Sequence, residues 1–260
     1  MARRYKRLQC GDYVREALYN CPEPRDTPVV RRERSKFTSD AQKKVNLEHS
    51  KIKLEMFIGG NFGPGDLLVT PTFAPDHYPA TYSEFQKKVQ KFFGLLRTVR
   101  QRQGHETRYI YAPHHTEKIR WHCHALINAV SPGDWEEIKS LWTWGDVHIK
   151  RFGAEEFFNP EAITGYMIGE TDDPKWSDRK NSARAWCHST NLRKIVVTTY
   201  REHNQTARLV LPENCELCEN KSRVNQFGSF EYVAYFRKNA VREESVPQSD
   251  SRELIDRGLL

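Results

Sequence analysis

The chain is organised around the sequence Trp121-His122-Cys123-His124-Ala125-Leu126-Ile127-Asn128, a short and mostly apolar segment. Its two histidines stand two residues apart. Successive side chains of an extended strand point to opposite faces, so His122 and His124 are expected to share one face of a strand. Imidazole is a common metal ligand, so the pair predicts half of a metal site. The alternative is one hydrogen-bonded core histidine beside one exposed histidine.

The segments on either side predict one α+β domain with a central antiparallel sheet flanked by helices. In the centre of the chain the predicted order is strand, helix, two strands, helix, strand and helix, which is typical of that class. Helices are expected after the caps Ser39, Thr81 and Ser131, and from Pro160. Strands are expected at residues 66–73, 107–112, 121–129, 146–150, 194–200 and 230–236.

Composition divides the chain into three regions. Residues 1–35 are predicted to form a basic, loosely ordered N-terminal arm with the cluster Arg31-Arg32-Glu33-Arg34, which either tracks phosphates or is simply solvated. Residues 36–240 hold the predicted domain, and residues 241–260 form a polar C-terminal tail.

The net charge of +7 favours a polyanionic partner, with nucleic acid ahead of an anionic membrane surface. No apolar run approaches the roughly 18 residues of a membrane-spanning helix, and the N-terminus lacks the apolar region of a secretory signal. We therefore expect a cytoplasmic protein without a membrane partner. The six cysteines are too scattered for a disulfide framework and are expected to be reduced.

Three segments, in order, resemble motifs of the HUH endonucleases, which are named for a histidine-hydrophobe-histidine strand. They are the strand Leu67–Phe73, the pair His122-Cys123-His124, and Tyr166 within Gly165–Glu170. The chain is most similar to rolling-circle replication initiation proteins of bacterial prophages and mobile elements. Weaker matches occur at residues 39–46, 61–66, 109–111 and 191–194.

This resemblance implies an RRM-like core and a metal-dependent endonuclease that nicks and rejoins single-stranded DNA. Tyr166 would be the nucleophile, and its attack would leave a 5′-phosphotyrosine and a free 3′-OH for priming. His122 and His124 would bind Mg²⁺ or Mn²⁺. The expected partners are a single-stranded origin with a stem-loop and the polymerase and helicase of the host. Without the metal motif, Tyr166 would be interpreted as a core aromatic on an amphipathic helix, and the presence of the motif reverses that preference.

Two positions depart from the family pattern. Relatives usually carry an acidic residue where this chain has His114, so we assign His114 as the third metal ligand, with His115 and Glu117 as substitutes and an exposed loop histidine as the alternative. Three nitrogen ligands suit Mn²⁺ or heavier ions better than Mg²⁺. Relatives also commonly have a lysine at the position of Gly169, and its role would pass to Lys175 or another cation.

A basic segment with interleaved tryptophans follows the tyrosine motif. Cations take phosphates and aromatic faces stack on unpaired bases, so this segment is either part of a single-strand groove or a surface loop over packed tryptophans. The predicted DNA-binding residues are Arg120, Lys175, Arg179, Lys180, Arg184 and Trp186.

Two further features limit the function. Cys215 and Cys218 form a lone CxxC, which predicts a turn with two free thiols rather than a zinc site, for which Cys187, His188 and His203 would have to supply ligands. The chain lacks a phosphate-binding loop of the helicase type. A single-tyrosine HUH transposase and a non-catalytic single-stranded DNA-binding protein are the alternative functions.

Overall fold

The computed structural model describes residues 2–21, 40–114, 121–153, 158–168, 185–225 and 228–238. Within these ranges the chain forms two antiparallel five-stranded sheets and four α-helices, which confirms the predicted α+β class. None of the described helices combines the length and the apolar character needed to span a membrane.

Sheet B contains the strand with the two histidines. Its order is β6-β3-β5-β4-β7, and every neighbouring pair is antiparallel. Strand β3 lies in the interior of the sheet, between β6 and β5, and β4 pairs with β5. The strands are β3 (Leu67–Pro71), β4 (Tyr109–His114), β5 (His122–Ile127), β6 (Val147–Arg151) and β7 (Cys187–His188).

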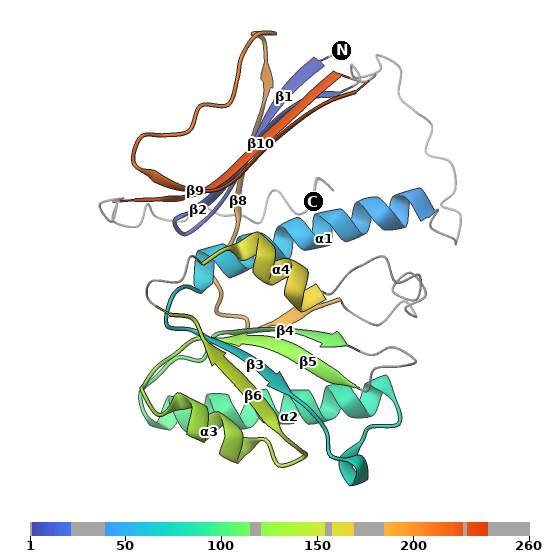
Figure 1. The fold of residues 1–260 in the computed structure, drawn as a ribbon, viewed down its shortest axis with the longest axis vertical. Coiled ribbons are helices and arrows are strands. Elements are labelled where there is room, and N and C mark those ends of the chain that lie inside the picture. The colour runs from blue at the N-terminus through green and yellow to red at the C-terminus, as the bar shows by residue number, and fades with distance from the viewer. Residues whose placement is uncertain are drawn as a thin grey trace, which may run out of the picture.

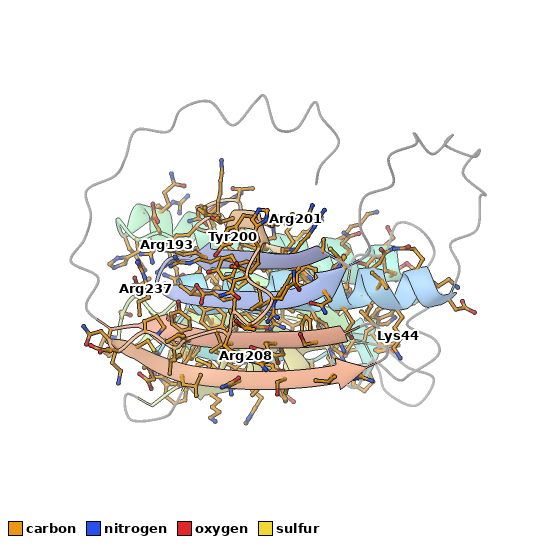
Figure 2. The ribbon with its side chains drawn as sticks, turned by 90° about the horizontal axis from the view of Figure 1, so that it is seen from above. Lys44, Arg193, Tyr200, Arg201, Arg208 and Arg237 are labelled. Carbon is orange, nitrogen blue, oxygen red and sulfur yellow. The ribbon has the colours of Figure 1, made fainter. Side chains whose placement is uncertain are left out.

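Sheet A combines both ends of the described chain, in the order β8-β1-β2-β10-β9. Strands β8 and β10 were predicted, whereas β1, β2 and β9 were not. Arg208, on the connection between β8 and β9, lies across this sheet and pairs with Glu231 of β10 (Figure 2). The strands are β1 (Ala2–Cys10), β2 (Tyr13–Cys21), β8 (Val196–Glu202), β9 (Cys215–Asn225) and β10 (Gly228–Arg237).

The expectation of a loosely ordered N-terminal arm is wrong for residues 2–21. They form the hairpin β1–β2, which turns at Gly11 with a φ of 56°. Arginines at several positions obscure the strand pattern in the sequence. Some of them pair with acids in the folded chain, and Arg15, for example, lies 2.6 Å from Glu55 of the first α-helix. The cluster Arg31–Arg34 and the tail 241–260 lie outside the described residues.

The elements stack in four layers, namely sheet A, helices α1 and α4, sheet B, and helices α2 and α3 (Figure 1). One core fills the space around α1 and α4 and includes Ile110, Ala112 and Leu126 of sheet B. A second core lies between the opposite face of sheet B and α2. The helices are α1 (Asp40–Asn61), α2 (Tyr82–Arg102), α3 (Asp134–Leu141), α4 (Pro160–Ile168) and the short 3₁₀ helix η1 (Pro75–His77).

Helix α2 begins as predicted. The Glu84 amide donates to Thr81 Oγ1 at 3.2 Å, and the Glu84 carboxylate accepts from the Ala80 amide at 2.9 Å. Helix α3 begins later than predicted, after Gly133 rather than Ser131. The carboxylate of Asp134 accepts from the amides of Val130 and Ser131 instead, so this side chain organises the turn before the helix.

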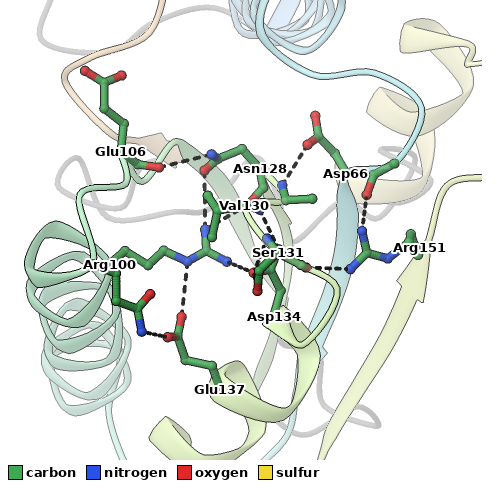
Figure 3. Close-up of polar contacts among 12 residues, drawn as sticks. Asp66, Arg100, Glu106, Asn128, Val130, Ser131, Asp134, Glu137 and Arg151 are labelled. Atoms are coloured by element: carbon green, nitrogen blue, oxygen red, sulfur yellow. Dashed lines mark hydrogen bonds and ion pairs between the residues drawn. The ribbon is translucent and has the colours of Figure 1, made fainter.

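Arg100 of α2 is a charged residue whose side chain is fully buried. Its guanidinium donates to the main-chain oxygen of Asn128 at 2.8 Å and to Glu137 at 3.3 Å, and lies 3.7 Å from Asp134 (Figure 3). This ion network fastens α2 and α3 to the end of β5, on the side of sheet B away from the histidines.

Candidate active site

The three predicted metal ligands lie on the face of sheet B that packs toward α1 and α4. His122 and His124 are half-buried, and Cys123 between them is buried against the opposite face. The register of β4 against β5 places His114 directly opposite His122. Antiparallel pairing of opposite residues puts their side chains on the same face, so two short strands bring three imidazoles together.

The geometry of this histidine triad fits one metal ion. The ring centroids of His114 lie 5.3 Å from His122 and 4.7 Å from His124, and the last two are 5.0 Å apart. One nitrogen of each ring lies within 4.8 Å of the others. Metal–nitrogen bonds of about 2.0–2.1 Å place three ligand atoms at most about 3.6 Å from one another, so the rings would draw together by up to about 1 Å to hold an ion.

Two hydrogen bonds orient the rings. Thr70 Oγ1 of β3 lies 3.0 Å from His124 Nδ1, which leaves Nε2 of that ring for a metal. His114 Nε2 lies 2.5 Å from the main-chain oxygen of Met167, in the last turn of α4. This contact requires the proton of His114 on Nε2 and leaves Nδ1 as the ligand.

The triad is suited to hold a cation because the imidazole of His124 stays neutral. Burial, followed by the proximity of His114 and His122, lowers the pKa of His124 to about 3. A neutral imidazole offers a lone pair, whereas an imidazolium does not. The donor set therefore fits a divalent ion, and its three nitrogens favour Mn²⁺ or a heavier ion over Mg²⁺.

Tyr166 reaches the triad from α4. Its ring centroid lies 4.5 Å from that of His124, and its side chain is 50% exposed. The alternative of a core aromatic is therefore wrong. The buried side of α4 consists of other residues, among them Ile163 and Met167. The phenol is accessible to a ligand and adjacent to the imidazoles.

Residues at the N-terminus of α4 stabilise the helix that carries Tyr166. Pro160 occupies the first helical position, as predicted, and the side-chain oxygen of Asn159 accepts from the amides of Glu161 and Ala162. Gly169, at the position where relatives commonly carry a lysine, lies outside the described residues.

Most of the predicted DNA-binding residues, and the substitute ligands, also lie outside the described residues. These are Arg120, Lys175, Arg179, Lys180 and Arg184, together with His115 and Glu117. Trp186 is described and is half-buried. Its indole N–H donates to Ser50 Oγ at 2.9 Å, and its ring meets Phe57 at 5.9 Å, so much of the side chain is engaged in packing against α1.

The cysteines are free thiols, as predicted. Cys215 and Cys218 lie in strand β9 rather than in a turn. Among the described residues, the histidine triad is the one group of three or more histidine, cysteine or acidic side chains close enough to share a metal ion.

Sequence reasoning missed two groups that contact the triad, Thr70 and the carbonyl of Met167. Thr70 lies within the strand segment already identified, but its contact with His124 depends on the register of β3 against β5. The Met167 carbonyl is one of the unpaired oxygens at a helix C-terminus, and no side-chain pattern indicates where it points.

Comparison with known proteins yields one finding. Residues 66–171 match the sequence model of a family described as Replication-associated protein ORF2. The match covers less than half of the chain, but it includes β3, the histidine triad and Tyr166. It is consistent with a rolling-circle replication initiator that acts on DNA. No curated protein and no solved structure matches the chain.

Proposed function

We propose that this protein is a metal-dependent endonuclease of the HUH type, which nicks and rejoins single-stranded DNA to initiate rolling-circle replication. The observation that carries the proposal is the half-exposed phenol of Tyr166, with its ring 4.5 Å from one imidazole of a triad suited to a divalent ion. The match of residues 66–171 to a replication-associated family supports DNA as the substrate.

In the proposed reaction, Tyr166 Oη attacks the phosphorus of one phosphodiester. A bond forms between this oxygen and phosphorus, and the bond from phosphorus to the 3′-oxygen breaks. The phenol proton passes to solvent, and the departing 3′-oxygen takes up a proton from solvent and becomes a 3′-OH. The 5′-phosphotyrosine retains a phosphodiester, so attack by a 3′-OH can reverse the step and rejoin DNA. A divalent ion, when bound, supplies Lewis-acid polarisation of the phosphate.

The residues around Tyr166 position these groups. Thr70 and the Met167 carbonyl fix the orientation of two imidazoles, as described above. The Met167 contact also ties α4, and with it the nucleophile, to the ligand His114. The expected DNA partners, a stem-loop origin and the polymerase and helicase of the host, belong to the same proposal.

The decisive experiment detects the covalent intermediate. The protein is mixed with Mn²⁺ and labelled single-stranded DNA carrying a stem-loop, and the products are separated in SDS. We expect a retarded, SDS-stable adduct that Tyr166→Phe abolishes. Tyr200→Phe is the matched control because Tyr200 is 49% exposed but lies on sheet A (Figure 2).

The same assay distinguishes the alternatives. A non-catalytic single-stranded DNA-binding protein would shift the DNA under native conditions and give no adduct in SDS. An adduct that survives in Tyr166→Phe but is lost in Tyr200→Phe would assign the nucleophile to the wrong sheet and refute the proposal. A transposase would form the adduct on the ends of an element rather than on a replication origin.

A further inference from the structure

A groove lies beside the candidate active site, between β3, β6 and α4. It encloses about 340 Å³, and both Tyr166 and Thr70 line it. Thr70 also contacts His124, so the groove adjoins the triad. A ligand seated in it would lie against the ring of the proposed nucleophile.

The strand register shows where the groove lies relative to the triad. Thr70 pairs with His148 of β6, and its hydroxyl contacts His124 of β5 on the other side. The three side chains therefore form one row across the sheet. Neighbouring strands are about 4.8 Å apart, so β6 lies roughly 10 Å from β5. A phosphate at the triad would leave the adjoining nucleotide within reach of the groove.

The lining of the groove combines an apolar surface with polar groups, two of which, Lys150 and Asn159, supply hydrogen-bond donors. Leu68 and the buried side chains of Phe152 and Ile163 form the apolar part. Lys150, also in the lining, has its ammonium 5.8 Å from the centre of the Phe152 ring. A planar apolar ligand with acceptors on its edge would match both parts.

Asn159 supplies the donor with the best-defined orientation. Its side-chain oxygen accepts from the amides of Glu161 at 3.0 Å and Ala162 at 3.1 Å. The oxygen is thus committed to capping α4, and the amide nitrogen is the atom that remains to donate. A carbonyl on a ligand could accept this hydrogen bond, whereas an amino group could not.

We propose that this groove binds one unpaired DNA base next to the phosphate that Tyr166 attacks, and that it selects the keto bases, thymine or guanine. The inference rests on the proposed function, which supplies the DNA strand. Thymine presents the acceptor O4 and guanine the acceptors O6 and N7, whereas cytosine and adenine present amino donors at the corresponding positions. The donors Asn159 and Lys150 therefore match a keto edge and oppose an amino edge.

The test measures binding without chemistry. Fluorescently labelled oligo(dT) and oligo(dC) of equal length are titrated with the full chain in EDTA, and anisotropy gives both dissociation constants. These probes are both pyrimidines and differ in the keto or amino group. We expect the wild type to bind oligo(dT) about two- to tenfold more tightly, the effect of one net hydrogen bond.

The critical variant is Asn159→Asp. Asp caps a helix as well as Asn does, so α4 should remain folded, but the donor in the groove becomes an acceptor. We expect the preference for oligo(dT) over oligo(dC) to disappear or reverse. The added negative charge weakens both probes alike and cancels in the ratio. Thr81→Asp is the matched control because it changes the cap of α2, on the opposite side of sheet B.

The outcomes separate this inference from the nicking reaction. A ratio in Asn159→Asp equal to that of the wild type overturns the base site, even if the adduct with Tyr166 forms. A changed ratio without any adduct supports the base site and overturns the proposed nuclease. A change of the same size in Thr81→Asp also overturns the base site, because the effect would then not arise in the groove.

Discussion

Thr70→Val tests whether the hydroxyl of Thr70 helps to build the metal site. In the wild type Thr70 Oγ1 lies 3.0 Å from His124 Nδ1 and holds the ring with Nε2 available to a metal. Valine keeps the branched shape that suits a strand and removes only the hydrogen-bonding group. The imidazole then loses the contact that fixes both its rotation and its tautomer.

Removal of such an outer-shell partner costs about 10- to 100-fold in metal affinity or activity. We therefore expect Mn²⁺ to bind Thr70→Val more weakly by about 1.4–2.7 kcal/mol. The value should fall toward the lower end if water replaces the hydroxyl, because His124 is half-buried rather than sealed. Thr70→Ser keeps the oxygen and should restore most of the affinity.

Isothermal titration calorimetry of the metal-free protein with Mn²⁺ measures this directly. Thr72→Val is the matched control on the same segment, because Thr72 Oγ1 donates to the main-chain oxygen of Asp146 at 3.1 Å and not to a ligand. The reasoning is refuted if Thr70→Val binds Mn²⁺ within twofold of the wild type, or if Thr72→Val weakens binding as much as Thr70→Val does.

Three further predictions concern His122, Arg100 and His124. His122→Ala should abolish the SDS-stable adduct. Anisotropy should still show single-stranded DNA binding within about threefold of the wild type, since phosphate contacts supply most of the affinity. Loss of both the adduct and the binding would contradict this prediction. Arg100→Leu should lower the free energy of unfolding by about 3–5 kcal/mol in urea, because it leaves the buried Asp134 carboxylate without its cation, and an unchanged midpoint would count against the network. The pKa of His124 is about 3 in the folded protein and about 6.5 in the unfolded chain. As pH falls, the unfolded metal-free chain therefore protonates this imidazole before the folded protein does. The free energy of unfolding should decrease as pH drops from about 6.5 toward 3. His124→Asn should flatten that slope, and an identical slope in the variant would show that other groups cause it.

The sequence by itself predicted the parts whose structure depends on local interactions. The cap of α2 at Thr81 and the start of α4 at Pro160 follow from the side chains present within one turn. The shared face of His122 and His124 follows from the two-residue period of a strand. The α+β class could be predicted because strand and helix periods alternate along the centre of the chain.

Only the tertiary structure decided which distant segments meet. Hairpin β1–β2 gave no clear strand signal because arginines stand at several of its positions, and some of them pair with acids such as Glu55, far away along the chain. The burial of Arg100 likewise depends on Asn128 and Glu137. These positions are set by pairs of residues that pack together only after folding, and a helical or strand period carries no information about them.

The candidate site depends both on sequence pattern and on the packing of distant segments. The local pattern identified His122 and His124, and the family resemblance indicated His114 and Tyr166. The register of β4 against β5 was needed to bring His114 to the pair, and the packing of α4 to bring the Tyr166 ring to within 4.5 Å of the His124 ring. The hydroxyl of Thr70 and the amide of Asn159 acquire their contacts from the same packing. Strand register and helix packing arise from long-range contacts, which is why the geometry of this site could be determined only from the folded chain.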